Sequence, residues 1–170
     1  TLDISKKEGQ KILVSLLEQA DILVENFKPG VMEKWGFSDS SIEKINKKII
    51  YARISGYGQT GPYAEKAGFA SVCEAFGGLR FVNGVPGEPP VRPNLSIGDT
   101  LAGIHAALGI LLAIIQRQKD GSGQVIDVAI FEAIFNLLEA VVPEYSGAGI
   151  IRQPSGTTIT GIVPTNTYLC

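Results

Sequence analysis

Apolar side chains first recur every three or four residues, which is the spacing of one face of a helix. They are Ile12, Leu13, Leu16, Leu17 and Ala20. Ser5 and Glu8 precede them at the spacing of a capping box, in which each side chain bonds the backbone at the start of a helix. The pattern therefore predicts an amphipathic helix over residues 6–19.

Two short apolar runs lack this spacing, residues 22–25 and 49–55, and each is typical of a buried strand. Between them the segment NFKPG turns the chain, and Ser40 and Glu43 repeat the capping-box spacing before a second apolar stripe. Parallel strands need a long crossover, which is usually a helix. We therefore expect an α/β fold in which helices cover a parallel sheet.

Glycine and proline are frequent over residues 56–93, so we expect surface loops there around one short helix at residues 71–76. Residues 100–116 then carry no charge. This run is shorter than the about 20 apolar residues of a membrane span and is rich in small residues. It predicts a buried core helix and no membrane segment.

Another buried helix is expected after a turn at residues 119–123, because Asp127 can cap the apolar positions that follow it. From Pro143 onward glycine, proline, serine and threonine become frequent, as in RQPSGTTITG. This change in composition predicts a linker that leaves the first domain.

Composition and charge narrow the classes of function. The chain has 170 residues, 45% of them hydrophobic, and its 15 basic and 17 acidic residues give a net charge of -2. This balance argues against a nucleic-acid partner bound through bulk basic charge. The two cysteines, Cys73 and Cys170, are too few for a zinc site and are expected to be free thiols in the cytoplasm. The first residue is Thr1 and residues 165–170 read as an unfinished strand, so we expect an internal segment of a longer protein.

Three glycines in GYGQTGP, Gly56, Gly58 and Gly61, match a dinucleotide-binding turn after a predicted strand. Pro62 follows them, and the next residues do not form the amphipathic helix that would hold a pyrophosphate. A plain glycine-rich loop is the better interpretation. A nicotinamide-dependent oxidoreductase stays open as an alternative.

Asp99 precedes the long uncharged helix and has two interpretations. At this position an aspartate is usually a helix cap. The helix dipole also favours its charged form, and a charged carboxylate beside Gly98 could attack an activated acyl group. His105, the only histidine, lies six residues further on, on a different face of the helix, and is expected to be packed rather than paired with Asp99.

The segment VENFKPGVMEKWG follows the first predicted strand and combines amide, aromatic and cationic side chains. Such loops at the carboxyl ends of parallel strands are where open α/β sheets bind ligands. Asn26, Phe27, Lys28 and Lys34 would suit an adenine nucleotide with phosphates. A solvated turn with a packed Trp35 is the competing interpretation.

Four long motifs in fixed order make the sequence resemble the class III CoA-transferase family, of the CaiB/BaiF and formyl-CoA transferase type. They are ADILVENFKPGVMEKWGF, IIYARISGYGQTGPYAEKAGF, PPVRPNLSIGDTLAGIHAALGILLA and GSGQVIDVAIFEA. The resemblance implies a Rossmann-like large domain, here residues 1–142, followed by a linker and the start of a smaller second domain at residues 143–170. It also implies an interlocked homodimer.

The resemblance places the catalytic nucleophile at Asp99, in IGDTLAG. It implies that this carboxylate carries CoA from an acyl-CoA to a small carboxylic acid through covalent intermediates. Coenzyme A is then a substrate, and neither a tightly bound cofactor nor a metal is expected. The CoA-binding positions implied by the family are Leu2, Asp3, Ile4, Asn26, Phe27, Lys28 and Lys34.

Two departures from the family bear on the reaction. Relatives that racemise 2-methylacyl-CoA use a histidine where this chain has Phe69, so a racemase is the weaker alternative. Many transferases have an acid where this chain has Ala70, and Glu74, one helical turn on, could replace it. The family's glycine-rich loop and its N-terminal strand do not occur in these residues, so we expect this chain alone to be inactive. A CoA-binding protein without turnover is a further alternative.

Overall fold

Three parallel strands form the centre of the structure, a computed structural model that describes residues 1–170. The strands are β1 (Ile22–Glu25), β2 (Ile50–Ser55) and β3 (Val125–Ala129), in the order β1-β2-β3. Val24 pairs with Ala52, and Ala52 with Ile126. Both connections between neighbouring strands contain helices, as parallel pairing requires. The expected α/β fold is confirmed.

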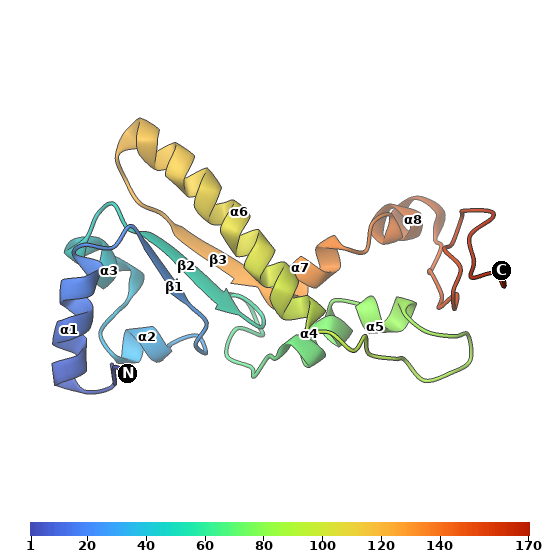
Figure 1. Cartoon of the computed structure of the whole chain (residues 1–170), viewed down its shortest axis with the longest axis horizontal. Coiled ribbons are helices and arrows are strands. Elements are labelled where there is room, and N and C mark those ends of the chain that lie inside the picture. Colours follow the sequence, from blue (N-terminus) through green and yellow to red (C-terminus); the bar gives the residue numbers. More distant parts are fainter.

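Eight helices accompany the sheet (Figure 1). They are α1 (Lys7–Leu17), α2 (Val31–Lys34), α3 (Asp39–Ile45), α4 (Ala70–Phe76), α5 (Leu79–Val82), α6 (Ile97–Asp120), α7 (Ile130–Asn136) and α8 (Val141–Ala148). The loops of residues 56–93 therefore contain two short helices, α4 and α5, where one was expected.

The two faces of β2 pack against different helices because alternate side chains of a strand point to opposite faces. Tyr51 is buried with Ile42 of α3 and Met32 of α2 in one apolar cluster. Ile54 packs on the other side against a cluster that contains Ala102 of α6. The sheet is thus covered on both faces, with α6 on one and α2 and α3 on the other.

The third strand corrects one expectation. Residues 125–129 form β3 and pair with β2, whereas a helix capped by Asp127 was expected, and α7 begins only at Ile130. A short apolar run with valine and isoleucine fits a buried strand as well as a helix. Here the strand forms because it pairs with the free edge of β2. Asp127 accepts a hydrogen bond from the Gln59 backbone N–H, at 2.8 Å from Oδ2. Its carboxylate therefore fixes the loop after β2.

Both expected capping boxes are wrong in detail. Ser5 donates its hydroxyl to Asp3 Oδ1 at 2.6 Å, and α1 begins at Lys7 without a side-chain cap. Ser38, two residues before the expected Ser40, caps α3 by accepting the Ser41 N–H at 3.2 Å. Both helices nevertheless form where their apolar stripes predict them.

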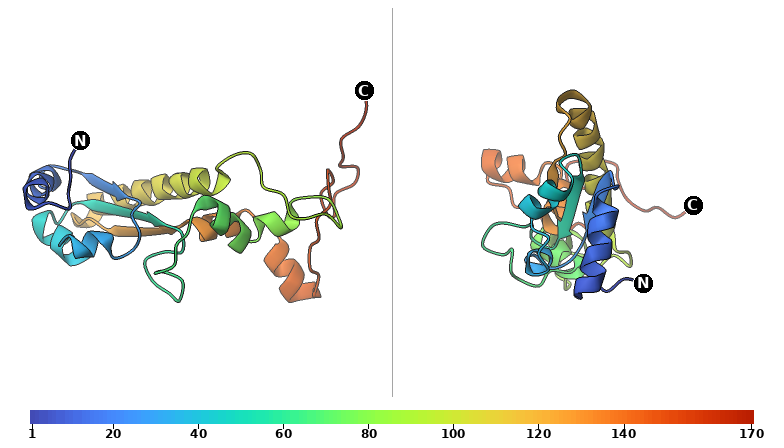
Figure 2. Two further views of the ribbon diagram at one scale, coloured as in Figure 1. Left: turned by 90° about the horizontal axis from the view of Figure 1, so that it is seen from below. Right: turned by 90° about the vertical axis from the view of Figure 1, so that its left-hand side faces the viewer.

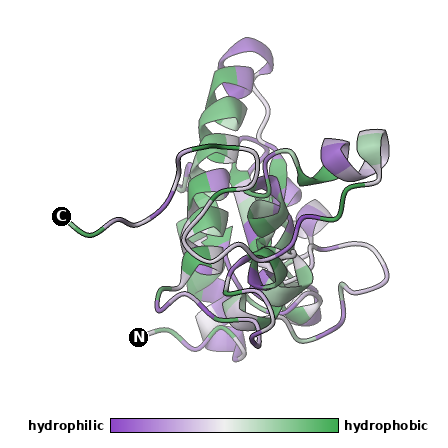
Figure 3. Cartoon of the chain, turned by 90° about the vertical axis from the view of Figure 1, so that its right-hand side faces the viewer, coloured by the Kyte–Doolittle hydropathy of each residue, from purple (hydrophilic) through white to green (hydrophobic).

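The long helix α6 is buried on one side only. Its buried residues are all small: Gly98, Ala102, Ala106 and Ala113. Five of its large apolar side chains are exposed: Ile104, Leu108, Leu111, Leu112 and Ile115. Hydrophobic colour runs along most of the helix in Figure 3. By length and composition α6 would suffice to cross a membrane, a test that core helices also pass, and 22% of its most apolar stretch is buried. The expected burial holds for the small-residue face and is wrong for the other.

The sheet with α1 to α3 lies at one end of an elongated molecule, and the C-terminal segment lies at the other (Figure 2). Residues 149–170 form no helix or strand, so the strand expected at residues 165–170 is absent. Helix α8 runs across Pro143, where the sequence predicted a linker. The division into two domains stays a prediction.

Candidate active site

A cavity of about 660 Å³ opens at the carboxyl ends of β1 and β2. Its wall combines the loop after β1, the loop after β2, the start of α4 and the first turns of α6. Asp99 lines it together with Asn26, Phe27 and Lys28. The structure therefore brings the expected nucleophile and three of the expected CoA-binding residues to one place, from segments about 70 residues apart in the sequence.

Asp99 lies in the first turn of α6 and does not cap it. Ser96 occupies the cap position, so the helix begins three residues earlier than expected. The Asp99 side chain is exposed and has no hydrogen-bond partner in the chain. Gly98 beside it packs tightly, because an added Cβ would lie 3.0 Å from Ile130 Cγ2 and 3.4 Å from Ala70. A free carboxylate at a helix N-terminus is thus presented to the cavity.

A buried ion pair fixes the loop that contains Asn26, Phe27 and Lys28. Glu25 Oε2 accepts the Phe27 N–H at 2.7 Å, and its Oε1 lies 3.0 Å from Arg53 Nε. Both charged side chains are about 3% exposed. Two Oε atoms of one carboxylate therefore connect β2 to the first turn of the loop.

Arg53 also reaches the helices that follow this loop. Its Nη1 lies 2.7 Å from Glu33 of α2 and 2.9 Å from Asp39 of α3. The hydrogen bond from Arg53 lowers the pKa of Glu33. The Phe27 ring meets Trp35 edge-on at 5.3 Å between centroids. Charges and aromatic rings thus hold this segment in place. Trp35 packs against the apolar cluster, as the solvated-turn interpretation expects, and Asn26, Phe27 and Lys28 are exposed. Ligand binding by this segment stays a prediction.

The remaining expected CoA-binding residues do not line this cavity. Leu2, Asp3 and Ile4 lie before α1, where Ile4 packs against the apolar cluster that contains Met32, and Lys34 is exposed at the end of α2. Asp3 is engaged locally, because hydrogen bonds from the Ser5 hydroxyl and N–H lower the pKa of its carboxyl. These four residues thus all lie outside the cavity with Asp99.

The glycine-rich loop after β2 does not lead into a phosphate-binding helix. The next helix, α4, begins at Ala70, as the presence of Pro62 suggested. Gly56 and Gly68 hold the ends of this loop together, since a Cβ on Gly56 would lie 2.6 Å from Gly68 Cα. The plain-loop interpretation is confirmed, and the loop contributes Lys66 to the cavity.

Neither His105 nor Cys73 is placed to act with Asp99. His105 Nδ1 lies 2.8 Å from the Leu101 carbonyl, a contact within its own helix. Cys73 is fully buried and donates its thiol to the Gly56 carbonyl at 3.3 Å. Burial raises the pKa of this thiol to about 11, so it is a packed, protonated residue. No group of three or more His, Cys, Asp or Glu side chains could hold a metal ion.

Sequence reasoning missed four polar residues of the cavity. They are Ser55, Lys66, Ser71 and Arg92, and the Ser55 hydroxyl is buried without a hydrogen-bond partner. Lys66 and Arg92 come from loops without periodicity, which gives no signal in a sequence. Ser55 is the last residue of a predicted strand, where a polar side chain could have been noticed.

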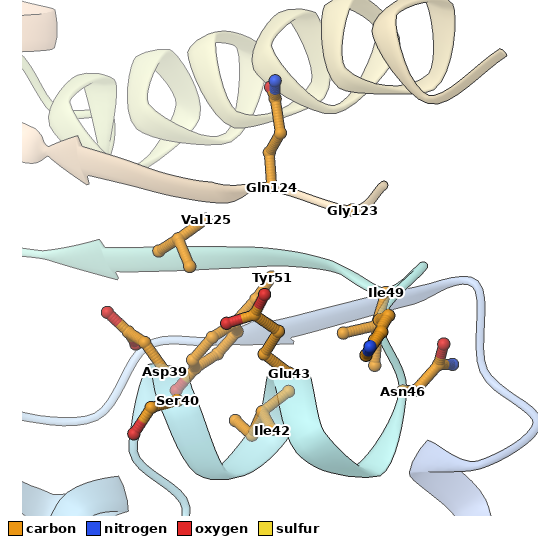
Figure 4. A pocket seen from close by; sticks show the side chains of 11 residues that line it. Asp39, Ser40, Ile42, Glu43, Asn46, Ile49, Tyr51, Gly123, Gln124 and Val125 are labelled. Atoms are coloured by element: carbon orange, nitrogen blue, oxygen red, sulfur yellow. The ribbon is translucent and has the colours of Figure 1, made fainter. Parts of the chain in front are cut away.

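A second cavity, of about 380 Å³, lies at the opposite ends of the strands (Figure 4). Tyr51 and residues of α3, including Asp39 and Glu43, surround it, with Gln124 before β3. Parallel sheets bind ligands at the carboxyl ends of their strands. The cavity with Asp99 is at those ends and is the candidate active site.

Comparison with known proteins identifies relatives of the chain. The chain is 45% identical over 168 residues to the succinyl-CoA–D-citramalate CoA-transferase of Chloroflexus aurantiacus, covering 99% of this chain and 42% of that protein. It is 44% identical over 157 residues to the alpha subunit of the succinyl-CoA–L-malate CoA-transferase of the same organism, covering 92% and 37%. The chain thus spans about two fifths of the length of these relatives.

The fold matches as well. The crystal structure of a CaiB/BaiF family protein from Brucella suis superposes with a TM-score of 0.91 at 32% identity, over 98% of this chain and 44% of that one. The model of CoA-transferase family III matches residues 1–170. This family relationship removes the nicotinamide alternative. The chain belongs to CoA-transferase family III.

Proposed function

We propose that this chain provides the nucleophile and part of the CoA site of an enzyme that moves CoA from an acyl-CoA to a carboxylic acid. The observation that supports this most directly is one cavity lined by Asp99, Asn26, Phe27 and Lys28. Neither His105 nor Cys73 is placed to serve as a nucleophile there. Phe69, which also lines the cavity, has a hydrocarbon side chain and cannot remove the proton that a racemase must exchange.

In the proposed reaction an Asp99 oxygen attacks the thioester carbonyl carbon of the donor. The C–S bond breaks, CoA leaves as a thiolate, and an acyl-aspartyl anhydride forms. The thiolate attacks the Asp99 carbonyl carbon, which releases the donor acid as a carboxylate and leaves an aspartyl-CoA thioester. The acceptor carboxylate repeats these two steps in reverse and regenerates the Asp99 carboxylate. No proton or electron is gained or lost overall.

Asp99 suits the role of nucleophile because its carboxylate is free. It has no hydrogen bond to give up, and it lies exposed in the first turn of a helix of 24 residues. Gly98 adds no side chain beside it. A substrate acyl group can therefore approach the oxygen atoms from the cavity.

The two groups of expected CoA-binding residues would contact different parts of CoA. Asn26, Phe27 and Lys28 line the cavity beside Asp99, where the thioester must lie. Leu2, Asp3, Ile4 and Lys34 lie outside it, toward α1 and α2. We assign the nucleotide end of CoA to that outer group, with the exposed Lys34 ammonium for phosphate.

The named substrates of the relatives give the first compounds to test. Two of them are named for succinyl-CoA, with citramalate or malate as the second acid. Succinyl-CoA is therefore the first donor to test here, and four- and five-carbon hydroxy acids are the first acceptors. We further propose a cytoplasmic homodimer for the full-length enzyme, as the family resemblance implies.

The test compares two aspartates of one helix. In the full-length enzyme, Asp99→Asn should lower the exchange of labelled succinate into succinyl-CoA at least about 1,000-fold, because the amide is not a nucleophile. Asp120→Asn, at the far end of α6, should leave exchange within about twofold. Exchange that survives in the Asp99 variant would overturn the proposal.

A further inference from the structure

We infer that Arg92 binds the free carboxylate at the far end of a dicarboxylic acyl group in the Asp99 cavity. The inference rests on the proposed function, since it names the class of acid that the site accepts. Arg92 lies in the loop before α6, seven residues before Asp99, and both line the same cavity.

The guanidinium of Arg92 is available to a ligand. Its side chain is 45% exposed, and its contact with the rest of the chain is Nε, 3.4 Å from Glu74 Oε2. The outer nitrogens, which form the planar fork that matches a carboxylate, have no partner in the chain. An arginine whose Nε is held by a carboxylate and whose two Nη atoms are free can bind a ligand carboxylate through two parallel hydrogen bonds.

Glu74 positions this arginine relative to the nucleophile. It is completely buried, and its Oε1 accepts the N–H of Gly98, the residue before Asp99, at 3.3 Å. Its Oε2 has no hydrogen-bond partner and lies 3.4 to 3.6 Å from Arg92 and Arg80. A buried carboxylate needs nearby cations. Glu74 therefore connects Arg92 to the first turn of α6.

The other cations of the cavity also favour an anionic ligand, but they are less suited than Arg92 to bind the terminal carboxylate of the acyl group. Lys28, Lys66 and Arg92 are its cations, and Asp99 is its one carboxylate. Lys28 belongs to the proposed CoA site, and Lys66 Nζ lies over the Tyr63 ring, 4.7 Å from its centroid. Ala70 adds a small, uncharged wall beside Gly98. Arg92 is thus the cation of the cavity that remains to bind the terminal carboxylate of the substrate.

One arginine would select both substrates of the transfer. The donor acyl group and the acceptor acid each join Asp99 through their own carbonyl carbon, so they occupy the same place in turn. Succinyl and butyryl groups have equal chain lengths and differ only in a terminal carboxylate or methyl group. Their relative rates therefore report the interaction with Arg92.

The experiment measures kcat/KM of the full-length enzyme for succinyl-CoA and butyryl-CoA with one common acceptor. We expect the wild-type enzyme to prefer succinyl-CoA. Arg92→Gln should lower the succinyl/butyryl ratio about 10- to 100-fold, the effect of a lost charged hydrogen-bond pair, and Arg92→Lys should lower it less. The matched control is Arg80→Gln, because Arg80 also faces Glu74 but does not line the cavity. It should change the ratio less than about threefold.

Equal falls of the succinyl/butyryl ratio in the Arg80 and Arg92 variants would overturn the inference. They would show that both arginines act only by compensating the buried charge of Glu74. A wild-type enzyme that prefers butyryl-CoA would also overturn it, even if no Arg92 variant folds, while leaving the proposed function intact. A wild-type enzyme that transfers CoA from neither donor would instead contradict the proposed function.

Discussion

Two buried carboxylates, Glu25 and Glu74, place the polar groups around the candidate site. Their exposed fractions are 5% and 0%, and each combines an arginine with one backbone N–H of a segment that lines the cavity. Glu25 holds Phe27 in the loop after β1, and Glu74 holds Gly98 at the start of α6. Because a carboxylate accepts several hydrogen bonds, one residue can fix both a charge and a loop.

The Glu25–Arg53 pair gives a prediction for stability. Arg53→Met should lower the free energy of unfolding by about 3–5 kcal/mol, because it leaves Glu25 buried without its cation. Lys44→Gln, an exposed change on α3, should alter it by less than about 0.5 kcal/mol. Urea unfolding of both variants measures these changes. Similar midpoints for the two would contradict the assignment of a buried pair.

The two cysteines should differ in reactivity. Cys73 is buried with a thiol pKa raised to about 11, so only about one molecule in a thousand has the reactive thiolate at pH 8, whereas Cys170 is exposed. Iodoacetamide at pH 8 should therefore label Cys170 in the native protein and both cysteines in urea. Peptide mass spectrometry reads the sites, and equal native labelling of Cys73 would contradict its burial.

Among the helices and strands, those with an apolar pattern over several residues were predictable from the sequence. Features that depend on strand pairing or on a single capping side chain were not. Apolar patterns that persist over several residues predicted three elements: the strands at residues 22–25 and 49–55 and the helix α1. The strand β3 was mistaken for a helix because five apolar-rich residues fit both periods, and its pairing with β2 cannot be read locally. The capping boxes expected for α1 and α3 each depend on one serine. Ser5 instead donates to Asp3, and Ser38 rather than Ser40 caps α3, so competing local hydrogen bonds decided both.

The candidate site was predictable in the same uneven way. Asn26, Phe27 and Lys28 directly follow a strand, so the topology of parallel sheets placed them at the correct edge. Arg92 and Lys66 reach that edge through loops whose course depends on tertiary contacts, such as the approach of Gly56 to Gly68. No periodic pattern in the sequence predicts that these two loop residues line the cavity.

Two glycines of α6 test how this helix packs on the sheet. A Cβ on Gly109 would lie 2.8 Å from Ile126 Cγ2 of β3, whereas one on Gly103 meets nothing within 4 Å. Gly109→Ala should destabilise the protein by about 1–3 kcal/mol through overpacking. Gly103→Ala should stabilise it by about 0.5–1 kcal/mol through helix propensity. Thermal unfolding of both variants measures this, and equal shifts would contradict the packing of α6 on β3.

The whole molecule is an α/β unit of CoA-transferase family III that spans about two fifths of its relatives. It combines a free aspartate with a cavity at the carboxyl ends of its strands. The homodimer, the cytoplasmic location, and the lack of nucleic-acid and membrane partners stay predictions. For the dimer, light scattering of the full-length enzyme should give twice the mass of one chain, and a monomer mass would contradict it.

Covalent catalysis by Asp99 is the central claim, and trapping the intermediate tests it most directly. The full-length enzyme is incubated with succinyl-CoA, treated with hydroxylamine and digested for mass spectrometry. Because hydroxylamine cleaves an aspartyl thioester or anhydride, we predict an aspartyl hydroxamate at Asp99 that forms only with the acyl-CoA. Turnover without a hydroxamate at Asp99, or with one at another residue, would contradict the account.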